Sequence, residues 1–134
     1  MKKLEGVGKV SFTPTSPRIT VLKSVVDALG LSTRDRICFV VGETVTGEHR
    51  VEARLNLADR REIKQPGLPL FESMVRTCMA IRSTTRQIHY VSISSRILAH
   101  HTFHMGDKFR WTILFDDDDS VSMVRIEYIP TRGQ

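Results

Sequence analysis

Residues 16–41 and 88–113 carry the same order of hydrophobic spacings. Each stretch begins with apolar residues at every second position, continues with a few residues at helical spacing, and returns to alternation. Alternation is typical of a half-buried strand, and spacings of three and four residues are typical of a helix facing a core. Each stretch is therefore predicted to form a strand, a short helix and a second strand.

The two stretches align without a gap when the chain is shifted by 72 residues. Their apolar positions coincide, as Ile19 does with Val91, and Asp35 falls on Asp107. A shared pattern that changes its period twice indicates an internal repeat.

Four further segments alternate in the same way and flank the two stretches. They are residues 6–12 and 50–57 in the first half and 73–81 and 120–129 in the second. Each half is therefore predicted to be a β-β-α-β-β unit. The first repeat covers residues 1–58, a polar connector interrupted by proline and glycine covers 59–72, and the second repeat covers 73–134.

Each repeat is too small to be stable by itself, because a unit of about 60 residues buries only about 60% of its unfolded surface. Two repeats that share one core also cover the sheet edges that either would expose alone. We therefore expect a mostly β fold with short helices, a small α+β barrel. The two repeats would fold together as one pseudo-dimeric domain with two-fold pseudosymmetry.

The two predicted helices differ in how they end. In the first repeat the helix is predicted from Lys23 to Leu29, and Gly30 suits the left-handed residue that often follows a helix. The second repeat has His101 and Thr102 near the matching position, so its helix is expected to end less cleanly.

Positive charge gathers in two windows of the chain, whose overall net charge is +5. Residues 1–41 hold seven basic side chains against three acidic ones, and residues 76–111 hold six against one. Two basic windows in one fold predict a face that binds a polyanion, although a solvated arginine-rich surface would give the same count.

The first repeat carries a known pattern in Arg18 to Val21, in Lys23, in Ala28 to Leu31 and in Asp35 to Ile37. Tyr90 to Ile93 and Met105 to Phe109 repeat it more faintly. These residues resemble the swapped-hairpin DNA-binding domain of the AbrB/MazE/SpoVT superfamily. The resemblance implies a swapped-hairpin barrel with pseudo-two-fold symmetry, and a transcription regulator that binds double-stranded DNA.

Both repeats are expected to contact the DNA. The expected residues are Lys9, Arg18 and Lys23 from the first repeat and Arg82, Arg86 and Arg96 from the second. The planar fork of arginine suits phosphates and guanine edges, and lysine supplies a point charge for phosphates. About six phosphate contacts would make affinity fall with salt at a log–log slope of about −5.

Other functions stay open at this stage. One alternative is a protein-interaction or adaptor barrel without DNA binding, and another is an antitoxin of the MazE type. A toxin partner is not expected, because little sequence follows Tyr128. The sequence leaves open whether the single-chain pseudo-dimer forms a homo-oligomer. An enzyme is not expected, because no phosphate-binding glycine loop or nucleophile with its base is recognisable.

The remaining candidate residues favour structural roles. Cys38 and Cys78 lack the spacing of a metal motif and are interpreted as small buried apolar residues rather than as a disulfide. No apolar run suits a membrane helix or a secretion signal, so a cytoplasmic protein is expected.

Histidines and acidic residues also cluster along the chain. His100, His101 and His104 lack an accompanying cysteine or carboxylate, so no metal is expected there. Residues 116–119, four consecutive aspartates, are interpreted as a solvated hairpin turn rather than a calcium loop. No cofactor is expected.

Overall fold

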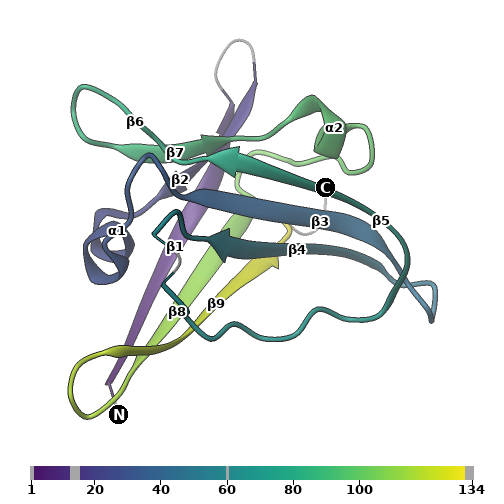
Figure 1. Ribbon diagram of the computed structural model, residues 1–134. Coiled ribbons are helices and arrows are strands. Elements are labelled where there is room, and N and C mark those ends of the chain that lie inside the picture. Colours follow the sequence, from purple (N-terminus) through teal and green to yellow (C-terminus); the bar gives the residue numbers. More distant parts are fainter. Residues whose placement is uncertain (1, 13–15, 60, 132–134) are drawn as a thin grey trace.

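The computed structural model describes residues 2–12, 16–59 and 61–131. This part of the chain forms nine strands and two short helices (Figure 1). In chain order they are β1 (Lys2–Phe12), β2 (Pro17–Val21), α1 (Lys23–Leu29), β3 (Arg36–Thr44), β4 (His49–Asn56), β5 (Phe71–Ala80), β6 (Arg82–Ser83), β7 (His89–Ser92), α2 (Ser95–Leu98), β8 (Lys108–Phe115) and β9 (Val121–Ile129). The mostly β fold with short helices is confirmed.

All nine strands belong to one sheet, in the order β5-β3-β4-β9-β8-β1-β2-β7-β6. The two strands at the ends of this order, β5 and β6, follow each other along the chain with only Ile81 between them. The sheet therefore curls back toward its own beginning and forms a nearly closed barrel (Figure 1).

Strand pairing joins the first and second halves of the chain. The first strand, β1, pairs antiparallel with β8, and β5 pairs antiparallel with β3. Strands β2 and β7 also pair antiparallel, and they place Ile19 directly opposite Val91. Residues 72 positions apart in the sequence therefore face each other where the two halves meet.

The barrel interior holds the apolar positions that the alternation predicts. In α1 the buried side chains are Val25, Val26 and Leu29, and Gly30 follows in the left-handed conformation at φ 62°. Helix α2 has a single turn, capped by the Ser94 hydroxyl, which accepts from the Arg96 amide at 3.2 Å. Both the first helix and the less regular second one are confirmed.

Two aspartates 72 residues apart are buried in the barrel, Asp35 at 3% exposure and Asp107 at 0%. The Asp35 carboxylate accepts hydrogen bonds from the backbone amides of Ser32 and Ala58, each at 2.9 Å. One bond ties the turn before β3, and the other ties the chain just after β4. Asp35 therefore fixes both ends of the β3–β4 hairpin.

Asp107 makes the corresponding contacts in the second half, and more of them. Its Oδ2 accepts from the His104 amide at 2.9 Å and from the Tyr128 hydroxyl at 2.7 Å. Its Oδ1 accepts from both the amide and the hydroxyl of Thr131, each at 2.8 Å. The carboxylate therefore joins the turn before β8 to the end of β9.

The interpretation of the cysteines as unpaired apolar residues is wrong. Cys38 of β3 and Cys78 of β5 form a disulfide across the two strands. They occupy directly opposite positions in the antiparallel pair, which brings their sulfurs together. Their separation of 40 residues along the sequence gave no sign of this, because strand register decides it.

Reduction of this disulfide is expected to lower the free energy of unfolding by about 2 kcal/mol, since the bond restricts the unfolded chain across a long loop. Urea titrations of the native and reduced, alkylated protein, with thiols counted before reduction, would measure this. Two free thiols per chain in the untreated protein would contradict the pairing.

Candidate nucleic-acid interface

The four strands β1, β2, β7 and β6 form a surface at the top of Figure 1, between the two helices. Because side chains alternate along a strand, the residues between the buried ones point outward. In β2, Ile19 and Val21 are buried and Arg18 lies between Pro17 and Ile19 on the other side. In β7, Val91 is fully buried and Tyr90 precedes it on the outer side.

An arginine and a tyrosine stack at the centre of this surface. The guanidinium carbon of Arg18 lies 4.3 Å from the centre of the Tyr90 ring. On the neighbouring strands, Ser11 is opposite Arg18 and Arg82 is opposite Tyr90. We call these four residues the central row. None of them is acidic, so the row carries the charge of two arginines.

Lys9 extends the positive charge along β1. It is exposed and lies directly opposite Lys108 of β8, which is exposed as well. Like charges in directly opposite positions of a sheet destabilise it. An anion bound between these two lysines would relieve that repulsion, and the sequence analysis did not single out Lys108.

Arg86 and Arg96 lie beyond opposite ends of the β2–β7 pair. The end of β2 at Val21 pairs with the start of β7 at His89, so the β6–β7 turn with the exposed Arg86 is at that end. Arg96 is exposed on α2, which follows the other end of β7. The two arginines therefore extend the positive charge on both sides of the central row.

Lys23 differs from the other expected contacts because it already has a partner. At the first position of α1, its amino group lies 2.9 Å from the Asp27 carboxylate, one helical turn on. This hydrogen bond and the attraction of Asp27 raise the pKa of Lys23. A phosphate would compete with Asp27 for this lysine.

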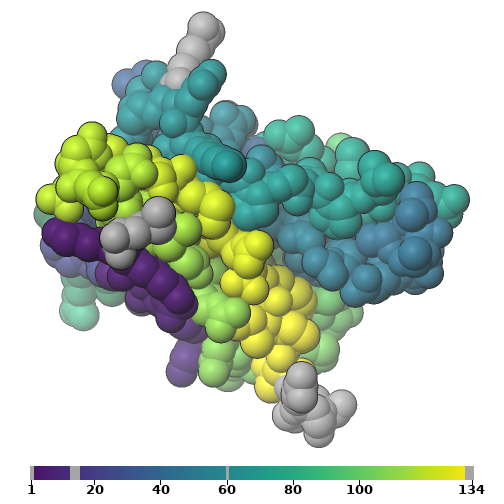
Figure 2. Space-filling view, turned by 90° about the horizontal axis from the view of Figure 1, so that it is seen from below, coloured from purple at the N-terminus to yellow at the C-terminus, as the bar shows by residue number. Residues whose placement is uncertain are grey.

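Acidic residues gather away from this surface. The turn of four aspartates joins β8 to β9 at the bottom of Figure 1, which confirms the hairpin interpretation. Asp119 of this turn pairs with Lys2 at 2.9 Å. Figure 2 shows the molecule from below, where β1, β8 and β9 lie side by side. The charge is therefore polarised between the two ends of the barrel.

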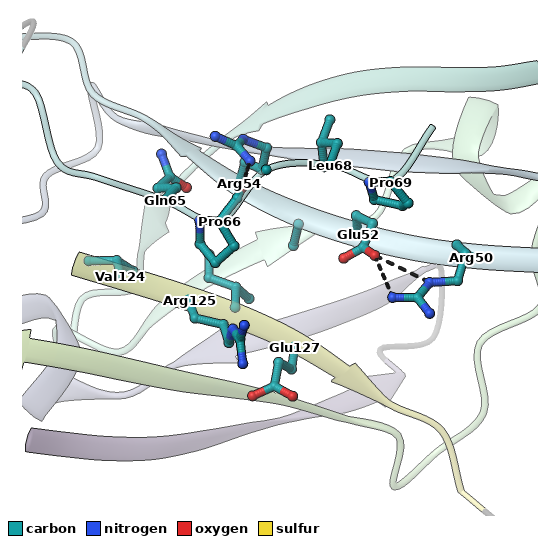
Figure 3. Close-up of a pocket in the computed structure, with 13 residues that line it drawn as sticks. Arg50, Glu52, Arg54, Gln65, Pro66, Leu68, Pro69, Val124, Arg125 and Glu127 are labelled. Atoms are coloured by element: carbon teal, nitrogen blue, oxygen red, sulfur yellow. Dashed lines mark hydrogen bonds and ion pairs between the residues drawn. The ribbon is translucent and has the colours of Figure 1, made fainter. Parts of the chain in front are cut away.

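A cavity of about 490 Å³ lies where β4 and β9 meet (Figure 3). The two strands pair at a single position, Glu52 opposite Glu127. The charged groups in the cavity largely satisfy one another, because Arg50 binds Glu52 at 3.0 Å and Arg54 donates to the carbonyl of Pro66. This pattern is that of a structural seam rather than of a ligand site.

The connector between the halves fills the rest of this seam. Lys64 forms a parallel bridge with Met123, and its carbonyl accepts from the Val124 amide at 2.9 Å. The Gln65 amide group bonds both the N–H and the C=O of Leu55, at 2.8 and 3.0 Å. One backbone group and one side chain thus take the place of a missing strand between β4 and β9.

A chain of hydrogen bonds also crosses between the halves beside the seam. Nε2 of His49 and Nδ1 of His101 are 3.0 Å apart, and Nε2 of His101 and the Tyr128 hydroxyl are 2.9 Å apart. Since Tyr128 donates to Asp107, it accepts from His101 Nε2–H, which leaves Nδ1 of a neutral His101 to accept from His49.

This chain predicts a dependence of stability on pH. Burial, and then the neighbouring His49, lower the pKa of His101 below its usual 6.5, although Asp107 opposes this. The unfolded chain therefore takes up a proton that the folded protein does not, and the free energy of unfolding falls as the pH drops below about 6.5. We expect His101→Phe to flatten the decrease between pH 7 and pH 5 in chemical unfolding.

A matched control for this effect is His100→Phe, which alters an exposed neighbouring histidine. This variant should keep the pH dependence of the unaltered protein. Equal slopes for His101→Phe and the unaltered protein would contradict the assignment.

No family model, curated protein or solved structure matches this chain. Neither of the two helices described here has the length and apolar character needed to span a membrane. Within the described ranges, no group of three or more histidine, cysteine, aspartate or glutamate side chains is arranged to hold a metal ion. The site is therefore argued from its own residues.

The structure brings Arg18 and Arg82 together in one row and places Lys9 on the same outer side of the adjacent strand. Sequence reasoning missed Tyr90 as the partner of Arg18, although both were in the aligned motif. The sign available was their separation of 72 residues, which would place them about the centre of a two-fold barrel.

Proposed function

We propose that this protein binds double-stranded DNA as an AbrB-like transcription regulator built from two tandem swapped-hairpin repeats. The observation that carries the proposal is the central row, where Arg18 and Arg82 flank Tyr90 on an outward face without an acidic residue in the row. Arginines on an exposed sheet suit both phosphate binding and readout of base edges.

The strand pairing supports the swapped-hairpin part of the proposal. The exchanged partners, β1 with β8 and β5 with β3, are those expected if each repeat gives its first strand to the other. Equivalent hydrogen bonds accompany the exchange, from the Val10 amide to the Asp107 carbonyl at 2.8 Å and from the Ile81 amide to the Asp35 carbonyl at 3.0 Å.

The proposal predicts salt-sensitive binding to duplex DNA. In band-shift titrations, affinity should fall with a log–log slope of about −5 if six basic groups meet phosphates. Arg18→Ala and Arg82→Ala should each weaken binding, by about 1–3 kcal/mol where the arginine also contacts a base.

Arg125→Ala is the matched control, because Arg125 is exposed on β9, outside the proposed interface. It removes the same charge and should leave affinity nearly unchanged. A folded protein that binds no duplex DNA even at low ionic strength would overturn the proposal. Equal losses for Arg125→Ala and Arg18→Ala would show attraction by net charge alone rather than binding by this face.

An adaptor barrel that binds protein is the second candidate. It is favoured by two exposed apolar residues at the far end of the β3–β4 hairpin, Val45 at 57% and Leu70 at 76% exposure. The two are neighbours, since the Val45 amide donates to the Leu70 carbonyl at 3.2 Å. Val45→Ser with Leu70→Ser would abolish partner binding under this candidate and leave DNA binding intact under the first.

A further inference from the structure

The outward positions of the proposed interface come in pairs related by the 72-residue repeat. Ile19 lies directly opposite Val91 at the centre, so Arg18 of one half corresponds to Tyr90 of the other. If the two positions held the same residue, the surface would present the same group to both halves of a bound duplex. They instead hold a cation and a neutral ring.

The same difference recurs at the other paired positions of the interface. Equivalence follows from strand register and from position in the helices, as with Lys9 and Ala80, which lie opposite Lys108 and Arg36. In each pair one member is basic and the other is neutral. The pairs are Lys9 with Ala80, Ser11 with Arg82, Arg18 with Tyr90, Lys23 with Ser95, and Ser24 with Arg96.

Arg18 is held in a defined orientation at the centre of this uneven surface. Its guanidinium stacks on the Tyr90 ring at 4.3 Å, which restricts the long side chain to one side of the pseudo-axis. No carboxylate pairs with Arg18 among the residues that the structure describes. The N–H groups of its fork therefore stay available to an acceptor, and a restricted fork loses less entropy on binding.

We propose that the protein binds DNA in one orientation, on a non-palindromic site, with Arg18 contacting a guanine edge in one half-site only. This inference rests on the proposed function. Guanine N7 and O6 in the major groove are the commonest specific partners of arginine. Tyr90 is a positioning residue that holds Arg18, and it leaves the other half-site without a matching contact.

Selection from a pool of random duplexes, followed by sequencing, tests this inference. The unaltered protein should retain a non-palindromic consensus. Arg18→Ala should remove one guanine from the consensus and weaken binding to the selected site roughly 5- to 150-fold, while binding to random duplex weakens much less. Tyr90→Arg, which equalises the two central positions, should enrich the inverted guanine in the other half-site and move the consensus toward a palindrome.

Tyr90→Phe is the matched control because it keeps the ring beneath the guanidinium, and it should retain the consensus. A palindromic consensus for the unaltered protein, or binding without any consensus, would overturn the inference and leave the proposed function standing. Absence of binding to any duplex would overturn the proposed function and the inference with it. The consensus of the unaltered protein decides the matter even if a variant fails to fold.

Discussion

Replacing Asp107 with alanine is expected to lower the free energy of unfolding by about 3–5 kcal/mol. The carboxylate is fully buried and accepts four hydrogen bonds, from His104, Tyr128 and both donors of Thr131. Its removal leaves these donors without an acceptor and releases the turn before β8 from the end of β9. Urea unfolding followed by the fluorescence of Trp111, buried on β8, would measure the loss.

Two other aspartates calibrate this prediction. Asp35 accepts two bonds in the equivalent place, so Asp35→Ala should cost about 2 kcal/mol. Asp27 is an exposed partner of Lys23, and Asp27→Ala should cost less than about 1 kcal/mol. A loss for Asp107→Ala no larger than that for Asp27→Ala would show that the buried bonds add little.

The same site should make the protein sensitive to acid. Burial alone would raise the pKa of Asp107, but its hydrogen bonds, beginning with the one from His104, lower it overall. The stabilisation is therefore complete above the usual value of 3.8 and is lost as the pH falls through the lowered value. Asp107→Ala should reduce the loss of stability in that range.

Alanine at position 8 is expected to cost about 3 kcal/mol or more, or to prevent folding. A Cβ atom added to Gly8 would lie 2.0 Å from the backbone carbonyl oxygen of Thr20, where β2 crosses β1. Because that oxygen belongs to the backbone, one strand would have to shift, and the pairing of β2 with β7 would shift with it. Thermal unfolding of Gly8→Ala measures the cost.

Gly67→Ala provides the matched control, since a Cβ atom there meets nothing within 4 Å. Its midpoint of unfolding should stay within a few degrees of that of the unaltered protein. Similar losses for the two variants would mean that β1 can move away from β2 at little cost.

Local patterns predicted those parts of the fold that depend on neighbours in the sequence. The alternation found the long strands, and the apolar stripe and the glycine placed α1 from Lys23 to Leu29 with Gly30 after it. Burial of Ile19 and Val91 likewise follows from a period of two. These features are encoded within a few residues of one another.

Contacts that depend on the register of distant strands were not predictable in this way. Cys38 and Cys78 face each other only because β3 pairs with β5 in one register, and a shift by one residue would separate them. The His49–His101 bond joins β4 to the segment after α2 for a similar reason. For the candidate site, the sequence supplied the basic residues, whereas register supplied the Tyr90 ring beside Arg18.

The pairing of β1 with β8 has a consequence for the order of events during synthesis on a ribosome. The main partner of the first strand begins at Lys108, so most of β1 waits until nearly the whole chain has emerged. Contacts this distant in sequence form slowly, and an unpaired strand is open to association with other chains. The alternating charged residues of β1, Lys3, Glu5 and Lys9, would help to keep the nascent strand in solution until its partner arrives.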